Sequence, residues 1–257
     1  MEEFTKLRGV NRILKRKLLT CRMEKKLIYE GKAKCIYEII GRENIYLQEF
    51  KDDATAFNGE KKQSVAGKGA LNNSISAILF EYLRSKGVNS HFIERVSDTG
   101  MLVRPLKIIK VEVVCRNIAA GSLVRKFGFS EAAELSKPLI EYYYKSDEFG
   151  DPLFTLAHIE EMKIANVNEM KKIDAVTLEV NLHLKKFFSD HGIKLVDFKL
   201  EFGYDSNGEI VLADEISPDT CRLWDLESGK KLDKDNFRFG LGNIAETYVE
   251  ILDKIRK

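Results

Sequence analysis

Charged residues stand at alternate positions in the segment LVDFKLEF, residues 195–202, and an Asp-Glu pair follows at 214 and 215. On a β-strand, alternate side chains share one face. Asp197, Lys199 and Glu201 should therefore point to one side, while the apolar residues between them point into a core. The segment DSNG that follows is a hairpin turn signal. The pattern predicts a hairpin with one charged face, which is either exposed to solvent or built to hold a ligand.

The length of the hairpin loop decides which residues of the two strands face each other. A two-residue Asn-Gly loop places Glu201 opposite Asp214, and a four-residue loop places Lys199 opposite Asp214. Both registers put Asp214 on the charged face, because they differ by an even number of positions. Two carboxylates a few ångströms apart repel each other unless a cation lies between them. Lys199 can partly neutralise the pair, and Mg²⁺, which favours one or two carboxylates plus substrate phosphate oxygens, is the alternative.

Two arginines could bind an anion near this face. Arg116 ends an apolar run, VEVVC, which reads as a buried strand, and Arg222 follows the Asp-Glu pair by a short loop. A planar guanidinium grips a phosphate or carboxylate through two parallel hydrogen bonds. Gly121 and Ser122 precede a short helical segment, whose first N–H groups can also receive an anion. A helix cap with surface arginines is the simpler alternative, but the combination favours a phosphate-bearing substrate.

A tight turn between two strands carries lysines in the segment YEGKAK, residues 29–34. Gly31 lets backbone N–H groups approach an anion, and Lys32 and Lys34 supply charge beside it. The segment matches neither the Walker A pattern nor the G-x-G-x-x-G fingerprint. Taken alone, it fits an ordinary hairpin with exposed lysines equally well.

The elements that must position these residues are grouped rather than strictly alternating, which favours an α+β fold over a doubly wound sheet. Strands dominate up to residue 50, and KDDATAFNGEKK, residues 51–62, is predicted as a surface loop that would also suit a mobile substrate loop. Apolar stripes predict helices over 68–87 and over Glu169–Ser189, and a closing helix is expected over Asn243–Arg256.

Composition excludes several classes of protein. The 257 residues include 42 basic and 40 acidic ones, a balance that argues against a general nucleic-acid binder. The four cysteines are scattered, with no C-x-x-C spacing, so reduced thiols in a cytoplasmic protein are expected. No apolar run approaches the roughly 20 residues that span a bilayer. Residues 1–22 are basic but lack the apolar core of a secretory signal. We expect a solvated extension there, or a true start at Met23.

Six segments in this order closely resemble the phosphoribosylaminoimidazole-succinocarboxamide synthase (SAICAR synthetase) family of de novo purine synthesis, and the match runs from about Glu24 to the C-terminus. They are YEGKAK, KGALNN, VEVVCRNIAAGSLVRKFG, LVDFKLEFG, LADEISPDTCRLWD and DKDNFR. The resemblance implies a SAICAR synthase-like α+β fold with an N-terminal antiparallel sheet lobe (23–110), a larger α+β body (111–257) and ATP in the cleft between them. It also implies that ATP, L-aspartate and carboxyaminoimidazole ribonucleotide (CAIR) give SAICAR, ADP and phosphate. A homo-oligomer, most simply a dimer, is expected.

The resemblance also implies a role for each residue singled out above. Gly31, Lys32, Ala33 and Lys34 would cover the ATP phosphates, and the strand Leu102–Ile109, with Leu106, would border the adenine. Glu201 and Asp214 would hold Mg²⁺. The ribonucleotide would be bound by Arg116, Ser122 and Arg222. Catalytic roles would fall to Lys34, Asp197 and Lys199.

Two departures and two alternatives accompany the resemblance. Some family members carry a carboxylate where this chain has Asn58, and the segment before Met23 has no counterpart in the family pattern. The enzymatic alternative is another ATP-dependent carboxylate–amine ligase or a small-molecule kinase on the same fold. The other alternative is a nucleotide-sensing or RNA-contacting protein that uses its basic N-terminus.

Overall fold

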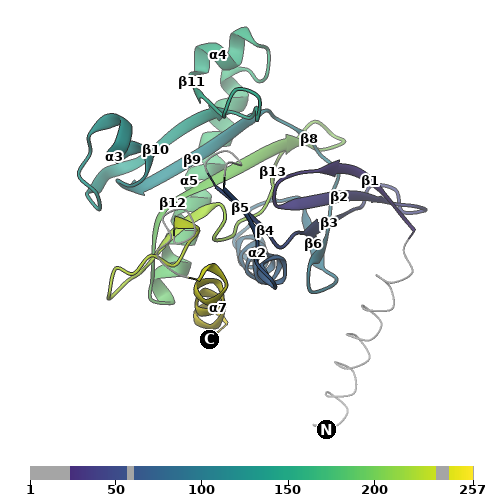
Figure 1. Ribbon diagram of the computed structural model, residues 1–257. Coiled ribbons are helices and arrows are strands. Elements are labelled where there is room, and N and C mark those ends of the chain that lie inside the picture. The colour runs from purple at the N-terminus through teal and green to yellow at the C-terminus, as the bar shows by residue number, and fades with distance from the viewer. Residues whose placement is uncertain (1–23, 57–60, 236–242, 257) are drawn as a thin grey trace, which may run out of the picture.

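The computed structural model of the chain describes residues 24–56, 61–235 and 243–256 (Figure 1). The extension 1–22 and the predicted departure at Asn58 lie outside these residues. Within the described part, no helix is both long enough and apolar enough to cross a membrane.

An antiparallel five-stranded sheet occupies the first part of the chain, on the right of Figure 1. Its strand order is β1-β2-β3-β7-β6. Strands β1 and β2, β2 and β3, and β6 and β7 are neighbours both in the sequence and in the sheet, whereas β3 pairs with the distant β7. The turn around Gly31 joins β1 to β2 as the sequence predicts. The strands are β1 (Lys25–Glu30), β2 (Lys34–Ile39), β3 (Tyr46–Phe50), β6 (Phe92–Arg95) and β7 (Gly100–Val103).

A seven-stranded sheet forms the centre of the body. Its main order is β11-β10-β9-β12-β13, and β14 and β8 also pair with β12. The 12-residue strand β12 is therefore hydrogen-bonded to four other strands. Its central position in the sheet explains why the alternating pattern of apolar residues is so long. The strands are β8 (Lys107–Ile108), β9 (Val111–Ile118), β10 (Glu134–Tyr144), β11 (Leu153–Phe154), β12 (Ile193–Tyr204), β13 (Ile210–Ala213) and β14 (Cys221–Asp225).

Helix α5 lies against β12 and β9, and helices α2 and α7 contact each other beneath the two sheets (Figure 1). The side chain of Asn166 accepts hydrogen bonds from the N–H groups of Asn168 and Glu169, and this capping box starts α5. The helices are α2 (Lys68–Ser85), α3 (Ser122–Phe127), α4 (Leu156–Glu161), α5 (Val167–Asp190) and α7 (Ile244–Ile255).

One apolar core runs through both sheets. Ile75 and Phe80 of α2, Val113 of β9 and Leu184 of α5 belong to the same cluster of buried side chains, together with Phe198 of β12. Burying this much apolar surface is the main force that orders the two sheets against each other. The α+β architecture expected from the sequence is confirmed.

Two local predictions are wrong. The segment 51–62 is not simply a surface loop, because β4 (Asp53–Ala56) and β5 (Lys61–Ser64) within it form a two-stranded sheet. The expected strand Leu102–Ile109 is also not continuous. It is divided into the end of β7 and the short β8, which pairs with Gly203 and Tyr204 of β12. The interruption occurs at residues 104–106, where Pro105 cannot donate a ladder hydrogen bond.

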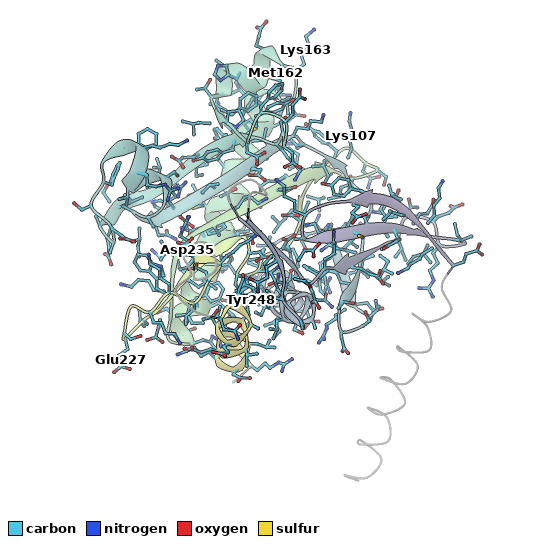
Figure 2. The ribbon with its side chains drawn as sticks, in the orientation of Figure 1. Lys107, Met162, Lys163, Glu227, Asp235 and Tyr248 are labelled. Atoms are coloured by element: carbon cyan, nitrogen blue, oxygen red, sulfur yellow. The ribbon has the colours of Figure 1, made fainter. Side chains whose placement is uncertain are left out.

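A buried ion pair joins α2 and α7 to the loop between β13 and β14. Lys68, with a fully buried side chain, donates to Asp219, and Asn72 donates to the same carboxylate at 2.9 Å. The hydroxyl of Tyr248 on α7 (labelled in Figure 2) donates to the other oxygen of Asp219 at 2.7 Å. Burial alone would raise the pKa of Asp219, but the neighbouring Lys234 and Lys68 hold it well below its usual range. The carboxylate is thus ionised and held by donors from separate elements.

We predict that Asp219→Ala lowers the free energy of unfolding by about 3–5 kcal/mol, because it leaves the Lys68 ammonium buried without its counter-charge. Urea denaturation at pH 7 measures this change. Asp98→Ala is the matched control, since Asp98 is 77% exposed and its pairing with Arg95 should be worth less than about 1 kcal/mol. A loss at Asp219 no larger than that at Asp98 would contradict the prediction.

Candidate active site

The seven-stranded sheet has one face packed on α5 and one charged face. On the packed side, Asn117 of β9 and Asn181 of α5 exchange amide hydrogen bonds of 2.8 and 3.0 Å. On the other side, alternate residues of β10, β9 and β12 share one face. Arg116 of β9 is paired with Asp197 of β12 and with Leu139 of β10, and paired residues point to the same side of a sheet. The charged face comprises Glu112 and Arg116 of β9, Glu141 and Tyr143 of β10, and Asp197, Lys199 and Glu201 of β12.

Both predicted registers of the β12–β13 hairpin are wrong. Glu201 pairs with Ala213 and Tyr204 with Ile210, so the loop holds the odd number of residues between them, 205–209. In this register a continued ladder would place Asp214 on the core face. Strand β13 instead ends at Ala213, and Asp214 has a φ of 65°, in the left-handed region. This local turn brings Asp214 to the charged face, where its Oδ2 lies 3.7 Å from Lys199 Nζ.

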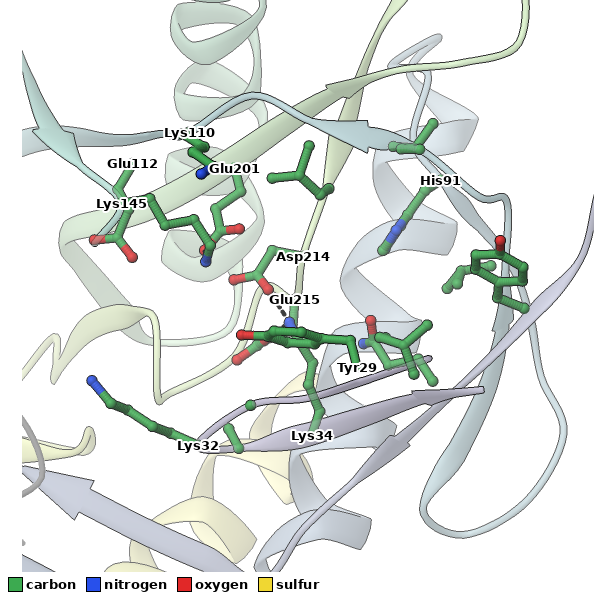
Figure 3. Close-up of a pocket in the computed structure, with 18 of the residues that line it drawn as sticks. Tyr29, Lys32, Lys34, His91, Lys110, Glu112, Lys145, Glu201, Asp214 and Glu215 are labelled. Carbon is green, nitrogen blue, oxygen red and sulfur yellow. Dashed lines mark hydrogen bonds and ion pairs between the residues drawn. The ribbon is translucent and has the colours of Figure 1, made fainter. Parts of the chain in front are cut away.

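A pocket of about 590 Å³ lies between the two sheets and is bounded below by the β1–β2 turn (Figure 3). This volume is in the range of small-molecule sites. One end is apolar and the other is charged. The residues that the sequence singled out and that line it are Gly31, Lys32, Ala33, Lys34, Leu106, Lys199, Glu201 and Asp214.

Alternating lysines and carboxylates fill the charged end of the pocket. Lys34 reaches from β2 to the carboxylates of Asp214 and Glu215, as Figure 3 shows. Glu201 Oε1 accepts hydrogen bonds from Lys145 at 2.6 Å and from Lys199 at 2.9 Å. Each of these carboxylates therefore has a cationic partner.

These contacts fix the protonation states of Glu201 and Lys199, which lie at the charged end of the pocket. Burial alone would raise the pKa of Glu201, but the ammonium groups of Lys199, Lys145 and Lys34 outweigh it and hold that pKa far below its usual range. Burial would lower the pKa of Lys199, and the carboxylates of Glu201 and Glu112 raise it instead. Glu201 is thus a carboxylate and Lys199 an ammonium throughout the physiological pH range.

A second cluster, which we call the arginine cluster (Arg116, Ser122, Asp197, Arg222 and Asp235), lies next to the pocket on the same face. Asp197 Oδ2 accepts from Arg116 at 2.9 Å and from Arg222 at 2.8 Å. Arg116 also donates to Ser122 Oγ at 2.7 Å, and Arg222 donates to Asp235 at 3.0 Å. The two guanidinium groups are thereby held beside Ser122, at the start of α3.

Gly121 allows this cluster to form. Its φ is 59°, and a Cβ atom at this position would lie only 2.6 Å from a terminal nitrogen of Arg222. A larger residue would both strain the backbone and displace the guanidinium. The start of α3 thus places Ser122 against Arg116 and the backbone of Gly121 against Arg222.

Comparisons with known proteins agree on one family. The family model described as SAICAR synthetase matches residues 27–255. The chain is 49% identical over 233 residues to phosphoribosylaminoimidazole-succinocarboxamide synthase of Bacillus subtilis, covering 91% of this chain and 96% of the relative. The chain belongs to the SAICAR synthetase family. The family expected from the sequence motifs is confirmed.

Solved structures of the family have the same fold. The crystal structure of the Ehrlichia chaffeensis synthase has a TM-score of 0.87 at 44% identity, covering 90% of this chain and 98% of that one. A SAICAR synthetase (Type-2) in complex with ADP has a TM-score of 0.86 at 47% identity, covering 90% and 97%. The SAICAR synthase-like fold is therefore confirmed.

The structure divides the predicted site residues into two neighbouring groups. Arg116, Ser122, Asp197 and Arg222 do not line the pocket but form the arginine cluster. The groups meet along β12, where Asp197 and Lys199 are two positions apart, roughly 7 Å on a strand. The predicted residues thus lie on one continuous surface.

Sequence reasoning missed several residues of the site. Lys145 contacts Glu201, Glu215 contacts Lys34, and Glu141 accepts from Arg116 at 2.6 Å. Glu215 stands next to Asp214 in the sequence, so it could have been included. Lys145 and Glu141 belong to β10 and the loop after it, and no local pattern marks them as partners of residues more than 20 positions away.

The residues of the pocket fit a magnesium ion that also binds substrate. Glu201 and Asp214 supply carboxylate oxygens, the donors Mg²⁺ prefers, and both approach Lys199 Nζ. Among the described residues, no group of three or more potential protein ligands forms a complete metal site. Mg²⁺ typically uses one or two carboxylates plus phosphate oxygens rather than a protein cage, so this donor set suits it.

A pH dependence of stability should arise from Asp233, which is fully buried behind the arginine cluster. Burial and the nearby Asp235 carboxylate raise its pKa to about 7, although its oxygens accept from the backbone N–H groups of Leu223 and Asp235. The pKa of Asp233 is higher in the folded protein than in the unfolded chain, where it is near 4. Its contribution to the free energy of unfolding is therefore complete below pH 4 and is lost as the pH rises through 7.

We therefore predict that the free energy of unfolding falls by about 2–4 kcal/mol between pH 5 and pH 8 on account of Asp233. In Asp233→Asn this part of the decline should be absent, even if the variant is less stable overall. Urea denaturation of both proteins at four pH values between 5 and 8 gives the two slopes. Parallel slopes would show that Asp233 is ionised across the whole window.

Proposed function

We propose that this chain joins L-aspartate to the carboxylate of CAIR with consumption of ATP, giving SAICAR, ADP and phosphate. The observation that carries this function is the shared face of β12, where a pocket lined by Lys32, Lys34 and Lys199 adjoins a cluster that holds two guanidinium groups. A ligase of this kind must bring a nucleoside triphosphate and a second phosphorylated substrate together, and the face provides one place for each.

The nucleotide is assigned to the pocket. A family member is known in complex with ADP. In this chain the turn formed by Gly31, Lys32, Ala33 and Lys34 would cover the phosphates, and Leu106, at the apolar end, would contact the base. Backbone N–H groups and two lysines at a tight turn suit a polyphosphate chain. Glu201 and Asp214 would hold Mg²⁺, which would offset the charge of the transferring phosphoryl group.

The ribonucleotide is assigned to the arginine cluster. Arg116, Ser122 and Arg222 would bind its phosphate, since guanidinium forks and a hydroxyl match phosphate oxygens. Both guanidinium groups are already oriented by Asp197, so little conformational entropy is lost on binding. The carboxylate end of CAIR would then point along β12 toward Lys199.

The chemistry follows from this arrangement. A carboxylate is a poor acyl donor, so one of its oxygens would attack the γ-phosphorus of ATP to give an acyl phosphate and ADP. The amine of aspartate would attack the acyl carbon, and phosphate would leave with that oxygen. Lys34 and Lys199 would offset the charge during phosphoryl transfer, and Asp197 would keep the acceptor in place by fixing the arginines.

The three described cysteines are free thiols, two of them buried, which supports a cytoplasmic location. A boundary between the lobes near residue 110 and a homodimer remain predictions.

A coupled ADP-release assay with each substrate omitted in turn tests the proposal. We expect sustained ADP release only when ATP, CAIR and L-aspartate are all present. Without aspartate, at most one equivalent of ADP per enzyme should be released. Continuous ADP release in the absence of aspartate would instead indicate a kinase.

A further inference from the structure

His91 lies at the wall of the pocket and is held there by its backbone. It stands immediately before β6, and its side chain is among those that line the pocket. Its N–H donates to Leu212 of β13 at 2.8 Å, and its carbonyl accepts from Arg104 at 2.8 Å. The residue is therefore fixed between the two sheets, and its imidazole can move only by rotation of the side chain.

The imidazole of His91 has an unpaired polar atom. The residue is only 5% exposed, and its Nε2 has no hydrogen-bond partner among the described residues. The ring lies against Phe80, with centroids 5.6 Å apart. Leaving a buried polar atom unpaired costs on the order of 1–3 kcal/mol. Such atoms in native proteins call for an explanation, and because His91 is one of the residues that line the pocket, a ligand bound there could supply the missing partner.

His91 lies away from part of the charged end of the pocket, the part that contains Lys145 and Glu112. In Figure 3, His91 lies on the opposite side of Asp214 from Lys145 and Glu112. The apolar side chains that line the pocket include those of Ile36, Tyr46, Val103, Leu106 and Ile108, and the polar side chains of Gln48 and Arg104 also line it. A flat heteroaromatic base fits an apolar slot of this kind, whereas the phosphates belong with the lysines at the other end.

The imidazole is uncharged at neutral pH. Burial lowers the pKa of His91, and the ammonium of Lys34 lowers it further, to about 3. A neutral ring gives no electrostatic attraction to a phosphate. It can still donate or accept one hydrogen bond at Nε2, depending on its tautomer. This is the chemistry needed to recognise the edge of a neutral base.

We propose that His91 Nε2 forms a hydrogen bond with the purine base of the bound nucleotide and sets the preference for one base over another. The inference rests on the proposed function, in that a nucleotide occupies the pocket. If His91 forms a hydrogen bond with the correct base, binding of the wrong base leaves this buried group unpaired. Such a loss discriminates effectively between the two bases.

The test is the affinity of two base-containing probes and one probe without a base. Calorimetry with ADP, GDP and inorganic tripolyphosphate would be carried out on the wild-type protein, His91→Phe and His91→Gln. Phenylalanine keeps the contact with Phe80 but has no nitrogen, and glutamine keeps a hydrogen-bonding group. His183→Gln on α5, away from the pocket, is the matched control. Circular dichroism of each variant verifies folding.

We expect His91→Phe to weaken ADP binding about 10- to 30-fold and to lower the ratio of ADP to GDP affinity by a similar factor, while tripolyphosphate binds as to the wild type. His91→Gln should recover at least part of the ADP affinity, and His183→Gln should match the wild type. The inference is overturned if His91→Phe binds ADP like the wild type, or if ADP and tripolyphosphate are weakened equally.

The two proposals fail in different ways. A wild-type protein that ligates aspartate while His91→Phe keeps full ADP affinity would disprove the role of His91 alone. A wild-type protein that binds neither ADP nor tripolyphosphate would disprove the proposed function, and the role of His91 with it.

Discussion

Replacing Glu201 by glutamine should lower the turnover of SAICAR synthesis by about 10²- to 10³-fold at saturating substrates. The side chain keeps its size, but the negative charge between Lys145 and Lys199 is lost. If Glu201 holds Mg²⁺ together with Asp214, the variant should also need a higher Mg²⁺ concentration for half-maximal activity. Initial rates measured over a series of Mg²⁺ concentrations give both quantities.

Glu209→Gln is the control for this experiment, because Glu209 belongs to the same hairpin but is exposed and does not line the pocket. Its rate and its Mg²⁺ dependence should equal those of the wild type. Wild-type activity of Glu201→Gln at saturating Mg²⁺ would remove Glu201 from the metal site and from catalysis.

Replacing Arg222 by alanine should weaken CAIR binding about 10- to 100-fold and leave ADP binding nearly unchanged. Arg222 contacts Asp197 and Asp235 in the arginine cluster and does not line the pocket. Calorimetry with CAIR and with ADP separates the two effects. Burial would lower the pKa of Arg222, but the surrounding carboxylates raise it, so the missing group is a permanent cation.

Two further variants make this result interpretable. Arg222→Ala leaves Asp197 and Asp235 with less compensation, so part of its effect could come from lower stability. Arg222→Lys keeps the charge but loses the planar fork, and it should still weaken CAIR binding. Arg125→Ala, on the exposed side of α3, should bind CAIR normally. Equal losses of CAIR and ADP affinity in Arg222→Ala would contradict the division between pocket and cluster.

Local patterns predicted the main elements because each records a local physical requirement. The alternation in 195–202 required a strand with one apolar face, and β12 has this arrangement. The apolar stripe in 68–87 gave α2, and the glycine between two strands gave the β1–β2 turn. These features depend on residues a few positions apart, and they can therefore be read from the sequence.

The hairpin register could not be predicted, because the pattern did not determine the loop length. The predicted placement of Asp214 on the charged face required a regular ladder, and the actual register would have turned its side chain into the core. Asp214 reaches the charged face only through its left-handed backbone conformation. Aspartate tolerates this conformation better than most residues, but the sequence around it does not require it.

Contacts between distant segments were the other part that the sequence left open. Lys145 with Glu201, Lys34 with Glu215 and Lys68 with Asp219 join residues 56 or more positions apart. No periodicity relates such residues, and only the arrangement of the two sheets brings them together. The resemblance to the family supplied candidates for the site, and it did not include the unpaired nitrogen of His91.

The most direct test of the ligase mechanism is the fate of the carboxylate oxygens of CAIR. CAIR labelled with ¹⁸O in both of these oxygens would be converted in the presence of ATP and L-aspartate, and the products analysed by mass spectrometry. We expect this mechanism to place one ¹⁸O atom in the released phosphate and one in the amide of SAICAR for each turnover. Unlabelled phosphate, or release of ADP without formation of the amide, would contradict it.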